Sequence, residues 1–186
     1  MPQEGAVDEP DPHVIDAARG GDLGAFEALV VRYQAEVWRL CFHLLRNESG
    51  ADDVTQDAFV RAYRFIGNYR GDSKFSTWLF SIARNCALDE ARRAGRRKRL
   101  SDRLEAQPAP QRRDVTTGIE VREALDALPL ELREAIVLID MFGTSYREAG
   151  LILKVAEGTV KSRVHRARGL LVEALGGRTS ESEHGV

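Results

Sequence analysis

Residues 145–171 decide the fold of the C-terminal half of this chain, and they read SYREAGLILKVAEGTVKSRVHRARGLL. Ser145 and Glu148 have the S-x-x-E spacing of a capping box, which predicts a short helix that starts at Tyr146. A longer helix follows the turn at residues 154–157, because apolar residues recur at helical spacing at Val160, Val164, Ala167 and Leu171. A short helix, a tight turn and a longer helix predict a helix-turn-helix.

The buried stripe of the longer helix leaves a basic face pointing outward, made of Lys161, Ser162, His165, Arg166 and Arg168. Such a face offers donors to phosphates and to base edges together, and Gly158 and Thr159 add free backbone N–H groups at the helix start. A helical hairpin with a solvated face is the alternative. However, residues 143–172 hold six bases against two acids, whereas a solvated face ordinarily mixes the two signs.

Apolar stripes predict three helices in the N-terminal half of the chain. The first spans roughly residues 24–46, and the second spans roughly 51–66 with Ser49 as its N-cap and Val54, Ala58, Ala62 and Phe65 on its inner face. Ser76 or Thr77 is expected to cap the third, which runs into a cluster of arginines. Residues 67–73, GNYRGDS, have the composition of a loop.

The organisation that follows is an all-α protein of two small helical domains joined by a flexible linker. We expect a disordered acidic tail at residues 1–12, a first domain at 13–97 and a linker at 98–118. The second domain covers 119–175, where Pro129 suits the first turn of a helix that Gly143 ends, and a tail covers 176–186. The pattern predicts no strand.

Charge and cysteine usage narrow the class of protein further. The net charge is −2, yet residues 84–103 hold eight bases against three acids, so two separate basic segments suggest two contacts with a polyanion. Cys41 and Cys86 are expected to be buried free thiols in a reducing cytoplasm. The histidines have no metal-ligand spacing, and neither a membrane span nor a signal peptide is expected.

Several of these segments together resemble the extracytoplasmic-function (ECF, group IV) sigma factors of the sigma-70 family, and the sigma-E-like members among them. Residues 158–168 resemble the GTV-K/R-SR-x-x-RAR signature of region 4, which residues 128–129 (LP) and 145–148 (SYRE) precede as in that region. Residues 51–59 resemble the core-binding segment of region 2, and residues 75–85 resemble its F-x-TWL-x-x-IA-x-N signature. The resemblance covers roughly residues 14–96 and 119–173.

The resemblance implies a fold, partners and a role for each matching residue. The protein is expected to bind RNA polymerase core and promoter DNA and to be controlled by an anti-sigma factor, with no cofactor, metal, small-molecule substrate or chemistry of its own. Core polymerase is expected to contact Asp53, Gln56 and Asp57. The −10 element is expected to contact Tyr69, Arg70, Gly71, Asp72, Arg84, Asn85, Arg92, Arg93 and Arg96. The −35 element is expected to contact Tyr146, Arg147, Gly158, Thr159, Lys161, Ser162, Arg163, His165, Arg166 and Arg168.

Structural interpretations stand beside some of these roles. The acids of the second helix also suit the positive end of its dipole, Asp52 above all, and the Tyr69 ring also suits a hydrophobic plug in its own loop. The chain departs from the family at Gly150 and Lys154. A glycine inside a helix costs up to about 1 kcal/mol relative to alanine, and Lys154 occupies a turn position that prefers a positive φ.

Two other classes of function remain as alternatives. A helix-turn-helix regulator that does not bind polymerase core, such as a response regulator, needs an N-terminal α/β domain, and residues 1–118 have no strand pattern. A metal-dependent nuclease could use Asp52, Asp53 and Asp57, but the sequence supplies no second cluster of ligands.

Overall fold

The structure of this protein is a computed structural model in which residues 8–101 and 117–179 are described. All regular secondary structure in these two segments is helical, which confirms the all-α prediction. The N-terminal bundle contains α1 (Pro12–Arg19), α2 (Leu23–Leu45), α3 (Glu48–Phe65), the 3₁₀ turn η1 (Ile66–Asn68) and α4 (Phe75–Ser101). The C-terminal bundle contains α5 (Thr117–Ala127), α6 (Leu130–Ile136), the π-helical turn η2 (Val137–Met141), α7 (Tyr146–Leu153) and α8 (Glu157–Thr179).

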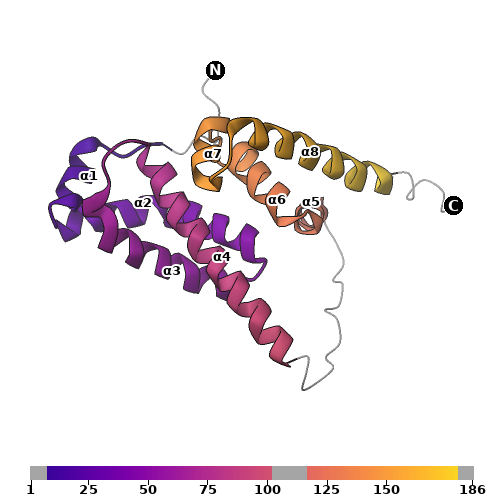
Figure 1. Cartoon of the computed structure of the whole chain (residues 1–186), viewed down its shortest axis with the longest axis horizontal. Helices are drawn as coiled ribbons and strands as arrows, with labels where there is room; N and C mark the ends of the chain where they lie inside the picture. Colours follow the sequence, from indigo (N-terminus) through magenta and orange to yellow (C-terminus); the bar gives the residue numbers. More distant parts are fainter. Residues whose placement is uncertain (1–7, 102–116, 180–186) are drawn as a thin grey trace.

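The N-terminal bundle packs along the apolar stripes that the sequence contains. The inner faces of α2, α3 and α4 meet around fully buried side chains, among them Tyr33, Leu40 and Leu79. Phe65 is an exception, because its side chain is 53% exposed where α3 leaves the bundle and passes into η1. Figure 1 shows that the end of α4 extends beyond the bundle.

Two predicted helix starts differ from the structure. α3 begins at Glu48, so its N-cap is Asn47, and the predicted cap Ser49 lies inside the first turn. α4 begins at Phe75, so neither Ser76 nor Thr77 is its N-cap. Glu9, far away in the sequence, accepts hydrogen bonds from the Phe75 and Ser76 backbone N–H groups instead.

The predicted tails and linker are only partly covered by the described residues. The acidic tail was predicted over residues 1–12, of which 1–7 lie outside the described residues, but Pro10 is buried and α1 begins at Pro12. The tail prediction therefore extends too far toward the C-terminus. α4 continues to Ser101, inside the predicted linker, while residues 102–116 lie outside the described part. α8 likewise runs to Thr179, inside the predicted C-terminal tail, of which residues 180–186 are not described.

The two bundles pack against each other through α4 and α7 and through α2 and α6. Figure 1 shows α5–α8 gathered beside α2 and α4. Phe80 of α4 packs on Phe142, with 5.3 Å between the ring centroids, and the Arg122 guanidinium lies 4.4 Å from the centre of the Phe42 ring. Most buried residues of the C-terminal bundle therefore join one continuous core with the N-terminal bundle. A small separate cluster contains Leu128, Leu132, Ile136 and Ala167.

Candidate nucleic-acid interface

α7, a short turn and α8 form the helix-turn-helix. The capping box is present, because the Ser145 hydroxyl accepts from the Glu148 N–H at 3.2 Å and the Glu148 carboxylate accepts from the Ser145 N–H at 2.8 Å. Lys154 ends α7 in the left-handed region with φ 57°, as its turn position predicted. The capping box and the left-handed residue at the end of α7 therefore set the direction in which the chain enters and leaves this helix before α8.

The structure explains why a glycine occupies position 150, inside a helix, which the sequence alone did not. A Cβ at this position would lie 2.9 Å from the backbone oxygen of Val155, which is closer than real Cβ atoms approach backbone. The Val155 N–H in turn donates to the Gly150 oxygen at 3.0 Å. The glycine lets the turn close tightly onto α7, so the cost in helix propensity is offset by the close approach.

The outer face of α8 carries the basic side chains predicted for DNA, and Lys161, Ser162, His165, Arg166 and Arg168 are all exposed. Lys161 pairs with Glu157 at 2.7 Å, and Arg168 pairs with Asp140 at 2.6 Å. Arg166 forms no ion pair with a described residue. Pairs between exposed side chains contribute little to stability, so this face can exchange them for phosphate contacts at low cost.

The remaining residues predicted for the −35 element lie around this face with different exposure. Arg147 and Gly158 are exposed, whereas Thr159 is half-buried at the start of α8. Tyr146 is half-buried, with the Lys161 ammonium 5.6 Å from its ring centre. Arg163 is only 20% exposed and lies 3.9 Å from Glu131, so it faces α6 more than solvent.

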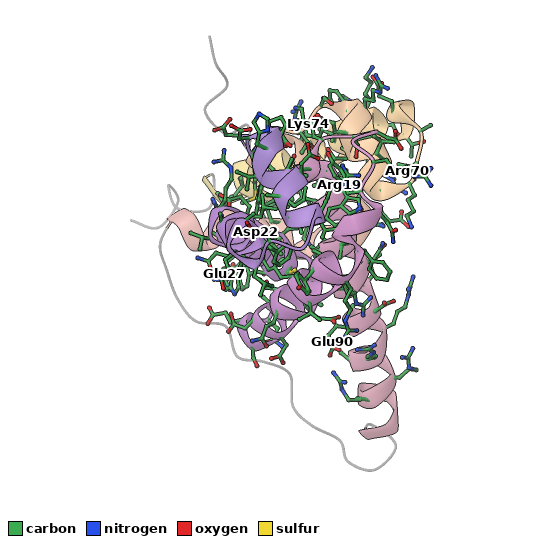
Figure 2. The ribbon with its side chains drawn as sticks, turned by 90° about the vertical axis from the view of Figure 1, so that its left-hand side faces the viewer. Arg19, Asp22, Glu27, Arg70, Lys74 and Glu90 are labelled. Carbon is green, nitrogen blue, oxygen red and sulfur yellow. The ribbon has the colours of Figure 1, made fainter. Side chains whose placement is uncertain are left out.

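The loop before α4 holds the first residues predicted for the −10 element. Arg70, Gly71 and Asp72 are exposed, and Gly71 has φ 77°, a conformation that favours glycine. Tyr69 is only 9% exposed, and its hydroxyl donates to the Ser73 oxygen at 2.6 Å. Its ring therefore fills its own loop, as the structural interpretation of the sequence expected. Figure 2 labels Arg70 and Lys74 in this loop and Glu90 further along α4.

Arg84 is engaged across the boundary between the two bundles. Its guanidinium makes a bidentate ion pair with Glu134 of α6, at 2.6 Å from Nε and 2.9 Å from Nη2. The two side chains are 13% and 3% exposed. In this arrangement Arg84 binds the other bundle instead of facing solvent. Asn85, the next predicted residue, is half-buried.

The three remaining arginines lie on the exposed end of α4. Arg92 and Arg93 pair with acids one turn away on the same helix, Asp89 at 3.3 Å and Glu90 at 3.9 Å. Arg96 is exposed and has no ion pair with a described residue. The end of α4 thus carries the basic surface that the charge pattern predicted.

The acidic residues predicted for polymerase lie on α3 beside a groove. Asp53 and Gln56 are exposed, and Asp57 is half-buried and pairs with Arg61 at 2.9 Å. Asp52 accepts a hydrogen bond from the Trp38 indole at 2.6 Å. Asp52 and Asp57 therefore bind different neighbours and do not converge.

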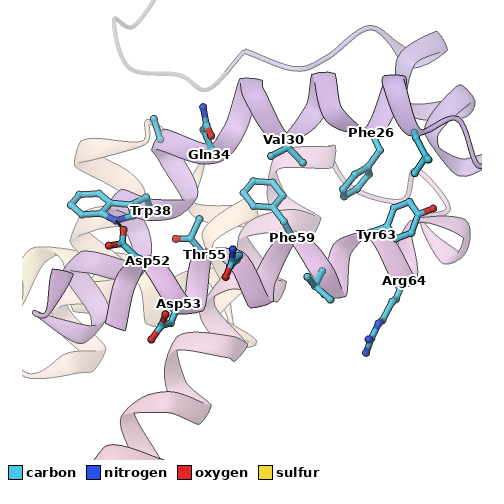
Figure 3. Close-up of a pocket in the computed structure, with 14 residues that line it drawn as sticks. Phe26, Val30, Gln34, Trp38, Asp52, Asp53, Thr55, Phe59, Tyr63 and Arg64 are labelled. Atoms are coloured by element: carbon cyan, nitrogen blue, oxygen red, sulfur yellow. Dashed lines mark hydrogen bonds between the residues drawn. The ribbon is translucent and has the colours of Figure 1, made fainter. Parts of the chain in front are cut away.

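The groove beside them has a volume of about 1040 Å³ between α2 and α3. Figure 3 shows Phe26, Val30, Phe59 and Tyr63 in the groove, and Asp53 at one end of it. This groove was not predicted from the sequence. Its signal in the sequence was Val60 and Tyr63, apolar side chains that lie off the buried stripe of α3 and are 47% and 44% exposed.

Metal and thiol chemistry have little support among the described residues. No group of three or more histidine, cysteine, aspartate or glutamate side chains converges there in a way that could hold a metal ion. Cys41 and Cys86 are buried and free, and burial raises their thiol pKa values to about 12 and about 11. No described helix is long and apolar enough to cross a bilayer.

The comparisons with known proteins decide the family. Residues 29–97 match the family Sigma-70 region 2, and residues 119–171 match Sigma-70, region 4. The chain is 36% identical over 173 residues to the ECF RNA polymerase sigma-E factor of Escherichia coli (strain K12), covering 85% of this chain and 90% of the relative. This chain belongs to the ECF sigma factors of the sigma-70 family. It is therefore an RNA polymerase sigma factor, as the sequence predicted.

Other relatives of this sigma factor agree. The ECF RNA polymerase sigma factor SigE of Mycolicibacterium smegmatis is 37% identical over 185 residues, which cover 94% of this chain and 72% of that one. The sigma factor RpoE, in its complex with the anti-sigma factor NepR from Bartonella quintana, superposes with a TM-score of 0.70 at 30% identity, covering 81% and 96% of the two chains. CnrH, in complex with the cytosolic domain of CnrY, superposes with a TM-score of 0.69 at 29% identity, covering 89% and 96%.

Proposed function

We propose that this sigma factor binds RNA polymerase core through the groove between α2 and α3. The observation that carries the proposal is the combination of two unlike surfaces at one place. Asp53 and Gln56 are exposed on α3, and the apolar groove lies directly beside them. Interfaces commonly combine an apolar centre with a polar rim, and an acidic rim suits a basic surface on the partner.

We further propose that the two basic surfaces bind the two promoter elements. The exposed face of α8 suits the major groove of the −35 element, because a helix fits that groove and arginine pairs with guanine edges there. The exposed loop residues 70–72 and the arginines of α4 suit the −10 strand, since a basic track follows the backbone of single-stranded DNA. In this proposal the Tyr69 ring stacks on a base only after it leaves its own loop. In this proposal Asn85 and Arg84 contact the strand after the bundles separate.

Separation of the bundles is part of this proposal. Arg84 is unavailable to DNA while it pairs with Glu134, and Lys74 of the loop pairs with Glu148 of α7 at 2.8 Å. Both ion pairs connect the surface proposed for the −10 strand to the C-terminal bundle. A sigma factor that holds both promoter elements must therefore break these pairs or exchange them for phosphates.

We also propose control by an anti-sigma factor, since RpoE and CnrH, which share this fold, have each been solved in complex with another protein, in the case of RpoE an anti-sigma factor. The sigma factor would perform no chemistry itself and would act in the cytoplasm, where polymerase and promoter DNA are found.

Copurification with polymerase core and run-off transcription test the proposed function directly. We expect the protein to co-elute with bacterial core and to start transcripts from a library of ECF-type promoters. Charge reversal by Asp53→Lys should weaken core binding by about tenfold, which corresponds to about 1.4 kcal/mol. Glu27→Lys is the matched control, because Glu27 is exposed on α2 and lies outside the groove.

Two results would contradict the proposal. A protein that binds duplex DNA but neither co-elutes with core nor starts transcripts would be a helix-turn-helix regulator of another kind. Equal loss of core binding in Asp53→Lys and Glu27→Lys would mean that the groove has no special role.

A further inference from the structure

The segment before α1 lies across α2 and reaches the start of α4. The backbone oxygen of Asp8 accepts from the Tyr33 hydroxyl at 3.1 Å and from the Arg32 Nη2 at 2.9 Å. The Asp8 carboxylate pairs with Arg32 at 2.7 Å, and Pro10 is buried. These contacts hold residues 8–10 in one place on the N-terminal bundle.

From this position the Glu9 carboxylate binds the first turn of α4. One oxygen accepts from the Phe75 N–H at 2.9 Å, and the other accepts from the Ser76 N–H at 3.3 Å and from the Ser76 hydroxyl. The first N–H groups of any helix lack partners within the helix, and a carboxylate near them also interacts favourably with the helix dipole. Glu9 therefore acts as the cap of α4, although 66 residues separate it from Phe75.

The residue at the N-cap position of α4 offers no substitute for this acceptor. The residue that precedes the helix is Lys74, whose side chain carries donors only. Phe75 and Ser76 are 1% and 6% exposed, so water has little access to this turn. An N–H group left without a partner in such a place costs about 1–3 kcal/mol, or else the turn moves until it finds one.

The turn that Glu9 caps is continuous with the loop proposed for the −10 strand. The Phe75 ring packs on Tyr69 and on Tyr33, with centroids 5.7 Å and 5.6 Å apart, and Trp78 packs on both Phe75 and Tyr69. A shift of the first turn would therefore move Tyr69 and the loop residues that follow it.

We propose that Glu9 is a positioning residue for −10 recognition: its carboxylate, fixed on α2 by its neighbour Asp8, holds the start of α4 and the loop at residues 69–74 in the form that receives the DNA strand. This inference rests on the proposed function of that loop. Glu9 itself touches no DNA in this proposal.

The test compares Glu9→Ala and Glu9→Gln with the wild type as full-length chains in the holoenzyme. The control is Asp16→Asn, which removes an exposed carboxylate of α1 whose one ion pair among the described residues is with Arg19. The probe is a single-stranded DNA that the wild-type holoenzyme selects from a randomised library. Core affinity and binding of a −35 duplex are measured beside it, and hydrogen exchange follows the Phe75 and Ser76 amides of the free protein.

Glu9→Ala should weaken binding of the single strand by about two- to thirtyfold, the range that corresponds to loss of a helix cap. Glu9→Gln keeps one acceptor oxygen, so its affinity for the single strand should lie between those of Glu9→Ala and the wild type. Exchange of the Phe75 and Ser76 amides should accelerate, while core affinity and −35 binding stay within about twofold of the wild type, since a factor of two is only about 0.4 kcal/mol. Asp16→Asn should behave as the wild type in all four measurements.

Three outcomes overturn the inference. Tighter binding of the strand by Glu9→Ala would mean that the carboxylate competes with DNA phosphates. An equal fall in all three affinities would indicate a general loss of fold, and unchanged strand binding despite faster exchange would remove any role in recognition. If the wild-type holoenzyme selects no single strand at all, the proposed function of the loop fails, and the exchange data still report whether Glu9 holds α4.

Discussion

The two bundles of this sigma factor present their proposed DNA contacts in opposite ways. In the C-terminal bundle, His165 and Arg166 stand exposed on α8. In the N-terminal bundle, the Tyr69 ring is buried in its own loop and Arg84 is paired with Glu134. The proposed −35 face is exposed as it stands, whereas two of the residues proposed for the −10 strand are engaged within the protein.

This difference suggests which step of promoter binding needs a rearrangement. The proposed contact of α8 with duplex DNA requires no change in the fold, because its basic side chains are exposed and their ion pairs lie at the surface. In the proposed function, the −10 strand contacts Arg84 only after the ion pair with Glu134 breaks. Most buried residues of the C-terminal bundle belong to the core that it shares with the N-terminal bundle, so its packing against Phe80 and its neighbours also matters for its stability.

The largest expected effect comes from breaking the ion pair between the bundles. Glu134→Ala leaves the Arg84 charge without its partner, which in a closed structure costs about 3–5 kcal/mol in the free energy of unfolding. The double variant Arg84→Ala/Glu134→Ala should recover much of this loss, because no unpaired charge remains. Urea unfolding of the four proteins of this cycle measures the coupling, and purely additive losses would show that the pair does not join the bundles.

A second variant tests whether the face of α8 is open to DNA. Arg166→Ala should weaken binding of the −35 duplex by about 1–3 kcal/mol if the guanidinium contacts a base. Fluorescence anisotropy with the holoenzyme measures this affinity, and Arg39→Ala is the control, because Arg39 is exposed on α2 and lies outside the groove. An unchanged affinity would mean that Arg166 does not contact the −35 duplex. The proposed difference in DNA access between the two bundles would then lose support.

Two substitutions at the turn of the helix-turn-helix are expected to change the stability of the protein in opposite directions. Gly150→Ala should lower the free energy of unfolding by about 1–3 kcal/mol, since its Cβ would meet the Val155 oxygen. Lys154→Gly should raise it by up to about 1 kcal/mol, because glycine adopts φ 57° without strain. Thermal or urea unfolding measures both, and a gain from Gly150→Ala would mean that helix propensity outweighs the close approach.

The smallest expected effect is the pH dependence of the second contact between the bundles. Burial raises the pKa of Glu148, but the hydrogen bonds from Lys74 and Ser145 outweigh this effect, so the pKa lies below its ordinary value. The stabilisation is therefore present above the ordinary carboxyl pKa of 4.5 and is lost as the pH falls through the lowered pKa. The free energies of unfolding of the wild type and Glu148→Gln should differ by less than about 1 kcal/mol at neutral pH and become equal in acid. Urea unfolding at a series of pH values measures both.

Much of the fold could be predicted because its signals are local. The stripes of α2, α3 and α8 and the capping box of α7 depend on residues three or four positions apart. The errors fall where the chain turns or ends. The caps Ser49, Ser76 and Thr77 were predicted from composition, but the bundle places the helix starts a few residues earlier.

The predicted contact residues also divide into features that follow from neighbouring residues and features that depend on tertiary packing. Their charge and order along the chain follow from the sequence, and so does the exposure of Lys161 and Arg166, which lie opposite a buried stripe of the same helix. The engagement of Arg84 with Glu134, and the groove beside Asp53, depend on packing between helices.

The sequence by itself determined the family, the helix-turn-helix and the two basic surfaces, because periodicity, capping and charge are properties of neighbouring residues. Only the tertiary structure decided which of those residues are available. Arg84 meets a partner 50 residues away, and α4 receives its cap from Glu9, 66 residues away. No local pattern encodes such pairs, because the packing of whole helices brings their atoms together.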